Sequence, residues 1–221
     1  ARMRPVSSED VVGQEHLVGP SGPLRRLIES DRLASIILWG PPGTGKTTLA
    51  ELVASTTKRN FERLSAVTAG VKDIREVIET ARRRLTLDDR GTVVFVDEIH
   101  RFSTVQQDAL LHAVESGLIT LVGATTENPS FELNNALLSR CRVYVLKTLD
   151  TDQIKALIQQ TLANSETGLG QQQLQLDKAA LDLLANAADG DARRALNLLE
   201  IANDLATEQG DRSIIDSAVL E

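Results

Sequence analysis

One stretch of the sequence constrains the fold more than any other. The short apolar run Ile36–Trp39 leads directly into the glycine- and proline-rich segment Gly40–Gly45, and a helical pattern begins at Lys46. A run of four apolar residues bounded by turn residues is typical of a strand that is buried on both faces. Such strands occur in parallel sheets whose faces are covered by the connecting helices. The stretch therefore predicts a strand–turn–helix unit of an α/β domain.

The same alternation continues through the first two thirds of the chain. Further strand-sized apolar runs lie at Phe61–Ala66, Val93–Val96, Leu118–Ala124 and Val143–Leu146. Helical patterns separate them, including Thr104–Glu115 and Asn135–Ser139. Five strands alternating with helices predict a parallel five-stranded sheet with helices on both faces. Helical stripes dominate after Lys147, so we expect an α/β domain over residues 1–148 and a small all-helical lid domain over residues 149–221.

Composition narrows the class of protein. The net charge of −7 argues against a surface coated in positive charge for static nucleic-acid binding, and 3% aromatic residues argue against a base-stacking platform. Cys141 is the single cysteine, which excludes a disulfide framework and fits a reducing cytosol. No apolar run approaches the ~18–20 residues of a membrane span, so we expect no membrane partner. The three histidines have no zinc-like spacing. The abrupt ends of the sequence indicate a fragment of a longer protein.

The segment Gly40–Thr47 fits the phosphate-loop pattern, with glycines at both ends of the loop followed by Lys46 and Thr47. Glycines allow backbone N–H groups to point at phosphate oxygens, and the helix N-terminus adds positive potential. Lys46 can reach the β- and γ-phosphates of a nucleotide, and the Thr47 hydroxyl can bind Mg²⁺. A chance glycine-rich turn is the alternative, and the strand before it and the helix after it disfavour that interpretation.

Two acidic residues end a later strand. Asp97 and Glu98 follow the apolar run Val93–Val96, which would place both carboxylates at the carboxyl edge of the sheet, where ligands bind in such folds. Asp97 would hold Mg²⁺ through its water shell, and Glu98 would polarise an attacking water. Two solvated acids at a strand end are the alternative. Thr125 and Thr126 follow the next strand, and one of their hydroxyls could contact a γ-phosphate. Threonines are commonplace at strand ends, and without further context that alternative is favoured.

Two arginines are further candidates. Arg140, in the segment Ser139–Arg142 before the last strand, could supply positive charge to a transition state, although an exposed arginine is more often a solvated surface charge. Arg193 lies in the first turn of a helix that an aspartate, Asp189 or Asp191, would cap. A cation at a helix N-terminus is locally unfavourable, which indicates an anionic partner for Arg193.

Together these motifs resemble the AAA+ ATPases of the clamp-loader-like subgroup, which includes the Holliday-junction branch-migration ATPase. The order of motifs is the same: phosphate loop, Asp-Glu strand, polar sensor, Ser-Arg-Cys, and a helical lid with Gly-Asp-x-Arg. The start, Arg4-Pro5 followed by Asp10–Gln14, is similar to the family segment that wraps the adenine. The resemblance implies a P-loop fold, ATP and Mg²⁺ as cofactors, and hydrolysis of ATP.

Narrower segments resemble the family of the bacterial replication-associated recombination protein A and its eukaryotic relative, the Werner-helicase-interacting ATPase. These segments are Leu64–Lys72, Asp97–Phe102, Gln106–Ala109 and Gly123–Asn134. The resemblance covers essentially the whole chain.

The resemblance implies a role for each matching residue. Thr126 would be the first sensor of the γ-phosphate, Arg193 the second, and Arg140 a finger that acts on the ATP of a neighbouring subunit. Glu98 would be the catalytic base. The expected nucleotide-binding residues are Val11, Val12, Pro41, Pro42, Gly43, Thr44, Gly45, Lys46, Thr47, Thr48, Asp97 and Arg193, with Val11 and Val12 beside the adenine and with Thr47 and Asp97 at the metal. Relatives often carry Asn on the second strand to restrain the catalytic Glu, whereas this sequence has Ser65 there.

The expected function is an ATP-hydrolysing core that acts on DNA at stalled or damaged replication forks. A clamp-loader subunit and an ATP-binding switch with little turnover are the alternatives. The family implies DNA forks, gaps or single-strand ends as partners, single-strand-binding protein as a further one, a homotetramer when full length, and a bacterial cytoplasmic, nucleoid-associated location. The basic segment Lys72–Arg84 is the best local candidate for DNA contact, and a solvated helix face paired with Glu76 and Glu79 is the equal alternative.

Overall fold

The computed structural model describes residues 5, 7–30, 33–164, 168–170, 174–209 and 212–215. Arg4, which belongs to the segment expected to wrap an adenine, lies outside the described residues, as do residues 171–173 and 216–221 of the expected lid. Within the described part of the chain, no helix combines the length and the apolar character that crossing a bilayer would require.

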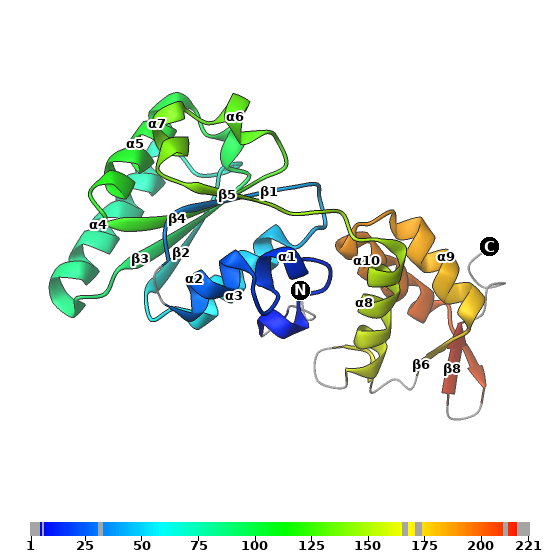
Figure 1. Ribbon diagram of the computed structural model, residues 1–221. Coiled ribbons are helices and arrows are strands. Elements are labelled where there is room, and N and C mark those ends of the chain that lie inside the picture. Colours follow the sequence, from blue (N-terminus) through cyan, green and yellow to red (C-terminus); the bar gives the residue numbers. More distant parts are fainter. Residues whose placement is uncertain are drawn as a thin grey trace.

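The chain forms an α/β unit followed by a smaller, mainly helical unit (Figure 1). The helices are α1 (Glu15–Val18), α2 (Pro23–Glu29), α3 (Lys46–Thr56), α4 (Val71–Asp88), α5 (Thr104–Glu115), α6 (Pro129–Glu132), α7 (Asn135–Ser139), α8 (Thr151–Ala163), α9 (Lys178–Ala188) and α10 (Ala192–Asp204), with 3-10 turns at η1 (Ser8–Asp10) and η2 (Ile99–Arg101). The strands of the main sheet are β1 (Ile36–Trp39), β2 (Asn60–Ser65), β3 (Thr92–Asp97), β4 (Ile119–Thr125) and β5 (Arg142–Val145).

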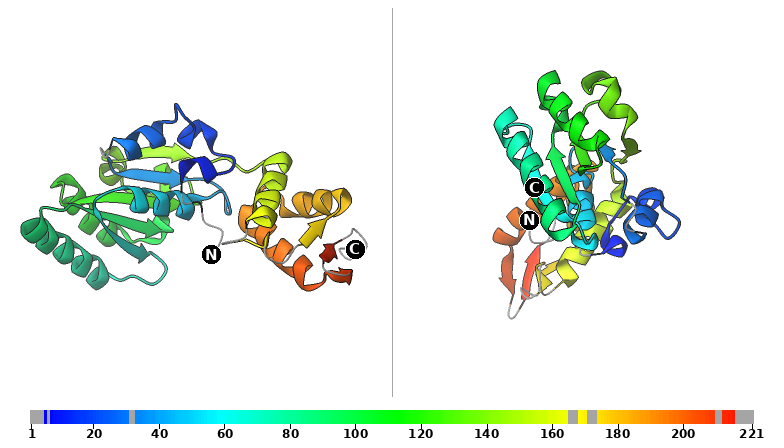
Figure 2. Two further views of the ribbon diagram at one scale, coloured as in Figure 1. Left: turned by 90° about the horizontal axis from the view of Figure 1, so that it is seen from below. Right: turned by 90° about the vertical axis from the view of Figure 1, so that its left-hand side faces the viewer.

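The main sheet is parallel throughout and has the order β2-β3-β4-β1-β5. Alternate strand residues enter two separate apolar layers. Leu38 and Phe95 pack with the side of the sheet that carries α3, whereas Ile37 and Val96 pack with the side that carries α4 and α5. The helices that cover the sheet can be followed in the two further views (Figure 2). The predicted five-stranded parallel sheet with helices on both faces is confirmed.

This topology determines where ligands can bind. β1 lies between β4 and β5, so the loop after β1 emerges beside the carboxyl ends of β4 and β3. In parallel sheets, the loops at this edge form the ligand-binding crevice. The residues singled out at Gly40–Thr47, Asp97, Glu98 and Thr125 all follow or end strands at this edge.

The second unit contains α8, α9 and α10 around a separate apolar core that includes Ile154, Ile158, Leu184 and Leu199. Each of the three helices begins after an aspartate whose side chain accepts a backbone hydrogen bond in the first turn. Such caps satisfy N–H groups that have no partner within the helix. For α10 the cap is Asp191, one of the two candidates named from the sequence. We propose residue 149 as the start of this unit.

The expectation that the lid would be entirely helical is wrong in one respect. A small three-stranded sheet, in the order β6-β8-β7, accompanies the helices and consists of β6 (Leu174–Leu176), β7 (Thr207–Gln209) and β8 (Arg212–Ile215). Strands of three or four residues are too short to display an alternating pattern. In addition, β6 pairs with β8, which is distant in the sequence.

Candidate active site

The phosphate-loop segment forms a tight turn between β1 and α3. Gly43 and Gly45 have φ angles of +70° and +96°, in the left-handed region that favours glycine. The Lys46 Nζ donates hydrogen bonds to the carbonyl oxygens of Gly40 and Pro41, at 2.6 and 2.7 Å. The Thr44 hydroxyl also donates to the Pro41 carbonyl, at 2.8 Å. The loop is thus folded around the lysine, and the first N–H groups of α3, which have no acceptor within the helix, follow it directly.

The ammonium group of Lys46 is buried, and burial lowers its pKa from the ordinary value. The carboxylates of Glu98 and Asp97 oppose this shift, and so does that of Asp191, whereas the charge of Arg193 adds to it. The candidate residues from β3 and from α10 therefore act electrostatically on the same ammonium group. A desolvated cation beside backbone N–H groups is suited to an anion such as a phosphate.

Asp97 and Glu98 have different surroundings at the end of β3. Asp97 lies 3.6 Å from the Arg63 guanidinium, measured from Oδ2 to Nη2. Glu98 has a φ angle of +55°, which is uncommon for a residue with a side chain and costs energy. Its carboxylate Oε2 lies 3.5 Å from His100 Nε2. Ser65, at the position where relatives often carry Asn, pairs in register with Asp97 across β2 and β3. The Glu98 carboxylate itself contacts His100.

The two threonines that follow β4 are placed differently. Thr125 is fully buried, and its Oγ1 lies 2.9 Å from His100 Nδ1 while accepting a hydrogen bond from the Glu127 backbone N–H at 3.0 Å. Its carbonyl accepts from the Gly40 N–H at 3.2 Å, which joins β4 to the start of the phosphate loop. Thr126, the expected sensor, is half-buried at the same edge. The Thr125 hydroxyl thus has hydrogen-bond partners within the protein, and the role of Thr126 as a sensor stays a prediction.

Arg140 lies away from this edge. It follows α7 and precedes β5, and the first residue of β5, Arg142, pairs with Ile36 at the start of β1. Arg140 is therefore near the edge where the strands begin, whereas the phosphate loop lies where β1 ends. Its side chain is half exposed and forms an ion pair with Glu115 at 2.9 Å. The length of β1 thus separates Arg140 from the phosphate loop of its own chain, and its role as a finger stays a prediction.

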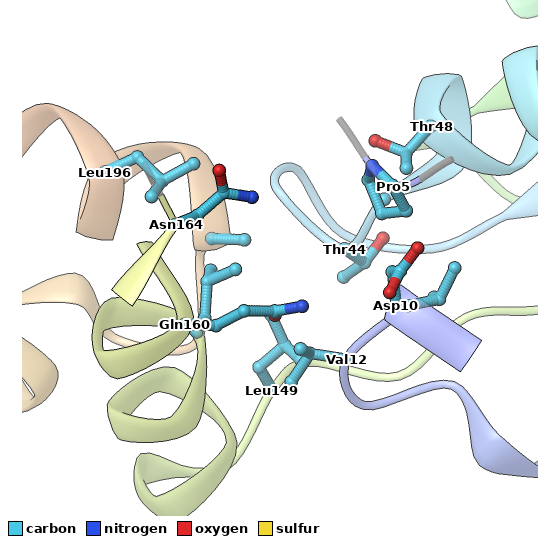
Figure 3. Close-up of a pocket in the computed structure, with 13 residues that line it drawn as sticks. Pro5, Asp10, Val12, Thr44, Thr48, Leu149, Gln160, Asn164 and Leu196 are labelled. Carbon is cyan, nitrogen blue, oxygen red and sulfur yellow. The ribbon is translucent and has the colours of Figure 1, made fainter. Parts of the chain in front are cut away.

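A cavity of about 250 Å³ lies between the phosphate loop and the helical unit (Figure 3). One wall carries Val11 and Val12, whose contact with an adenine stays a prediction, and the loop contributes Thr44, Gly45 and Thr48. The opposite wall comes from Leu149, α8 and α10, and the amide ends of Gln160 and Asn164 point into the cavity. The sequence patterns singled out neither amide. Their spacing of four residues along the chain is the pattern that could have placed them on one face.

Gln14 is another residue whose importance the sequence did not reveal. Its fully buried side-chain amide donates to the carbonyl oxygens of Thr44 and Lys147, at 3.2 and 2.8 Å, and accepts from the Lys147 N–H at 3.1 Å. One side chain thus joins the N-terminal segment, the phosphate loop and the connection to α8. A glutamine directly after a glycine, here Gly13 with a φ angle of +83°, is the only local indication.

The first turn of α10 also contacts the loop. The Ala192 N–H donates to the Gly43 carbonyl at 3.1 Å, and a Cβ atom on Gly43 would lie 1.8 Å from Asp191 Oδ1. Arg193, the next residue, is exposed in this turn. The Asp191 carboxylate can move aside only by giving up its hydrogen bond to the Arg194 N–H, which caps α10.

We expect Gly43→Ala to lower the free energy of unfolding by about 2–4 kcal/mol, because left-handed strain adds to the contact with Asp191. Gly45→Ala is the matched control: its φ angle is also positive, but no atom lies within 4 Å of the added Cβ. Urea denaturation of Gly43→Ala, Asp191→Ala and the double variant measures the coupling. The double variant should be less destabilised than the sum of the single variants, and strict additivity would contradict the proposed contact.

The cations of α4 are largely paired with acids. Lys72 contacts Glu76 at 3.7 Å, Arg82 contacts Glu79 at 3.4 Å, and Arg84 forms an ion pair with Glu62 on β2. These pairs favour the interpretation of a solvated helix face over a free basic track.

Among the described residues, no group of three or more His, Cys, Asp or Glu side chains is arranged to hold a metal ion.

Comparison with known proteins places this geometry in a family. The family model of the ATPase family associated with various cellular activities (AAA) matches residues 36–149, just over half of the chain, and an AAA C-terminal domain model matches residues 170–221. The fold also matches that of the Thermotoga maritima RuvB Holliday junction branch migration motor, with a TM-score of 0.76 and 29% identity, over 93% of this chain and 66% of that chain. A mutant of the same RuvB matches over 100% of this chain and 71% of that chain, with a TM-score of 0.80 and 27% identity.

Several curated proteins are similar over nearly the whole chain. Replication-associated recombination protein A is 52% identical over 100% of this chain in Haemophilus influenzae, and 53% identical over 93% in Escherichia coli strain K12. ATPase WRNIP1 of Dictyostelium discoideum is 50% identical over 91% of this chain. The chain spans 49%, 46% and 23% of these three relatives, so it corresponds to about half of the bacterial proteins.

The family match covers β1 through the end of the main sheet, and therefore includes the phosphate loop, the Asp97–Glu98 pair and Arg140. The AAA family and the RuvB-like fold both imply that the chain binds a nucleotide. The chain belongs to the AAA family of ATPases, alongside replication-associated recombination protein A and WRNIP1.

Proposed function

We propose that this chain binds ATP at the phosphate loop and hydrolyses it. The observation that carries the proposal is the buried Lys46 ammonium, which is hydrogen-bonded within the loop and acted on by the charges of Asp97 and Glu98. A cation for the phosphates and two carboxylates for metal and water are the parts that a hydrolytic site requires. The cavity beside Val11 and Val12 would receive the adenine.

The residues present fit a magnesium ion. Mg²⁺ prefers oxygen ligands and retains several waters, so it needs few protein groups. The Thr47 hydroxyl and the Asp97 carboxylate would hold the ion, and both belong to segments at the carboxyl edge of the sheet. When bound, Mg²⁺ neutralises charge on the phosphate oxygens.

Glu98 would accept a proton from the water that attacks the γ-phosphorus. Lys46 would stabilise the charge that builds up on the phosphate oxygens, and the Thr126 hydroxyl and Arg193 would contact the γ-phosphate from β4 and α10. Arg140 would act on the ATP of a neighbouring subunit, because it lies at the opposite edge of its own sheet. This arrangement requires an oligomer, for which the homotetramer of the full-length protein is our proposal.

We further propose that hydrolysis serves DNA transactions at stalled or damaged replication forks in the bacterial cytoplasm, at the nucleoid. The support is the similarity to proteins named replication-associated recombination protein A and to a RuvB described as a Holliday junction branch migration motor. DNA forks, gaps or single-strand ends would be the substrates, and single-strand-binding protein a partner. A clamp-loader subunit, or an ATP-binding switch, is the alternative.

The test of this function is ATP hydrolysis by the intact protein with forked, gapped, single-stranded and fully paired DNA. We expect at least one of the first three substrates to raise kcat about 10-fold over the rate without DNA, whereas continuous duplex should raise it less. Equal rates with all four substrates would contradict a role at forks. A rate below detection under every condition would favour the switch.

A further inference from the structure

His100 forms a bridge between Glu98 and the end of β4. Its Nε2 lies 3.5 Å from Glu98 Oε2, and its Nδ1 lies 2.9 Å from Thr125 Oγ1. The side chain of His100 is only 12% exposed, and that of Glu98 is 32% exposed. His100 sits in the η2 turn, which begins immediately after the strained Glu98 backbone. The imidazole is therefore enclosed between two fixed segments at the site.

The Thr125 hydroxyl contacts one of the two ring nitrogens of His100. The Thr125 hydroxyl already accepts from the Glu127 N–H at 3.0 Å. It can donate its own hydrogen either to His100 Nδ1 at 2.9 Å or to the Glu127 carbonyl at 3.2 Å, and the histidine contact is the shorter. If the hydroxyl donates to Nδ1, the hydrogen of the ring is on Nε2 and faces the Glu98 carboxylate. The opposite tautomer would turn a lone pair toward the carboxylate, which is unfavourable.

The same threonine is tied to the phosphate loop. The Thr125 carbonyl accepts from the Gly40 N–H at 3.2 Å, and Thr125 pairs in register with Trp39 at the end of β1. A continuous chain of contacts therefore runs from the phosphate loop through Thr125 and His100 to Glu98. It connects the groups that would hold the phosphates to the group that would take the proton.

We propose that His100 is a positioning residue for Glu98. Its Nε2 faces the Glu98 carboxylate at 3.5 Å while the Thr125 hydroxyl donates to Nδ1, and the imidazole so aims the carboxylate at the attacking water. This inference rests on the proposed hydrolytic function, since it assigns a role relative to Glu98. It also explains how the chain can orient Glu98 with Ser65, rather than an amide, on β2. Correct aim matters because a displacement of about 1 Å at a reacting group can cost on the order of 100-fold in rate.

The test compares three substitutions of His100 in the intact protein. Gln can place its amide N–H₂ near the position of Nε2, whereas Asn reaches only the position of Nδ1 and Ala reaches neither. We expect His100→Ala and His100→Asn to lower kcat for ATP about 10–100-fold with KM unchanged, and His100→Gln to recover most of the loss. His112→Ala is the control, because His112 is an exposed histidine on α5.

Thr125→Val separates positioning from simple packing. It should lower kcat in the wild-type background and have little further effect in His100→Ala, because both changes disturb the same contact between His100 and Glu98. Equilibrium binding of a fluorescent ATP analogue and the melting temperature identify variants that fail to bind or fold. Equal kcat in all three His100 variants and wild type, or a kcat that rises in His100→Ala, would overturn the inference.

The two failures are distinguishable through Glu98→Gln. If that variant hydrolyses ATP at the wild-type rate, the proposed function itself is wrong. If Glu98→Gln is inactive while His100→Ala binds and hydrolyses ATP normally, only the positioning role is wrong.

Discussion

Glu98→Gln is expected to lower the rate of ATP hydrolysis by about 10²–10⁴-fold while ATP binding is retained. The substitution preserves the size of the side chain but removes the group that would accept a proton from water, and general-base catalysis contributes a factor of this order. The phosphate loop, Lys46 and the cavity beside Val12 are untouched, so the nucleotide should still bind. Steady-state phosphate release gives the rate, and a fluorescent ATP analogue gives the affinity.

Glu132→Gln is the matched control, because Glu132 is an exposed glutamate on α6, away from the phosphate loop. The substitution removes the same charge as Glu98→Gln does. It should hydrolyse ATP at the wild-type rate. Wild-type hydrolysis by Glu98→Gln would show that the acids at the end of β3 do not activate water.

Arg140→Ala should be inactive for a different reason. An arginine finger is worth about 10³–10⁵-fold in rate, and a value near the lower end is expected here because Arg140 is half exposed and already paired with Glu115. ATP binding should be unaffected, since Arg140 lies at the opposite edge of its own sheet. If Arg140 acts on a second chain, two chains must associate before ATP is hydrolysed. The hydrolysis rate of the wild-type protein should therefore increase more than linearly with protein concentration.

Mixing two inactive variants tests that the arginine acts between chains. Lys46→Ala would lose ATP binding but keep its arginine, and Arg140→Ala would keep its ATP but lack the arginine. A mixed assembly contains interfaces in which Arg140 of the first variant faces ATP bound by the second, so activity should reappear. If the mixture stays as inactive as its components, Arg140 does not act in trans.

The sheet was accessible from the sequence because its strands are near-continuous apolar runs that end in turn residues or in the carboxylate pair. The runs at Ile36–Trp39 and Val93–Val96 each fall within an observed strand, and Thr104–Glu115 and Asn135–Ser139 match observed helices. The position of the site could also be predicted from little more than the phosphate loop, because a loop that follows a buried parallel strand lies at the ligand-binding edge of the sheet.

The features that escaped prediction depend on contacts between residues that are distant in the sequence. Gln14 is separated by 133 residues from Lys147, and His100 by 25 from Thr125, so no local pattern reports either contact. The pairing of β6 with β8 was missed for the same reason, whereas β7 and β8 pair locally but are too short to display an alternating pattern. The roles of Thr126, Arg140 and Arg193 remain predictions, because each would be fulfilled only with a nucleotide or a second chain in place.

The side chain of Gln14 has a mechanical consequence. Its amide is fixed to Lys147 on both the nitrogen and the oxygen, and the same nitrogen holds the carbonyl of Thr44. The phosphate loop and the segment that leads into the helical unit are therefore held by the same side chain. Neither can be displaced alone without breaking a hydrogen bond of the buried Gln14 amide, at a cost of about 1–3 kcal/mol. A displacement of the phosphate loop relative to the connection into α8 must therefore break or rearrange the hydrogen bonds of this one side chain.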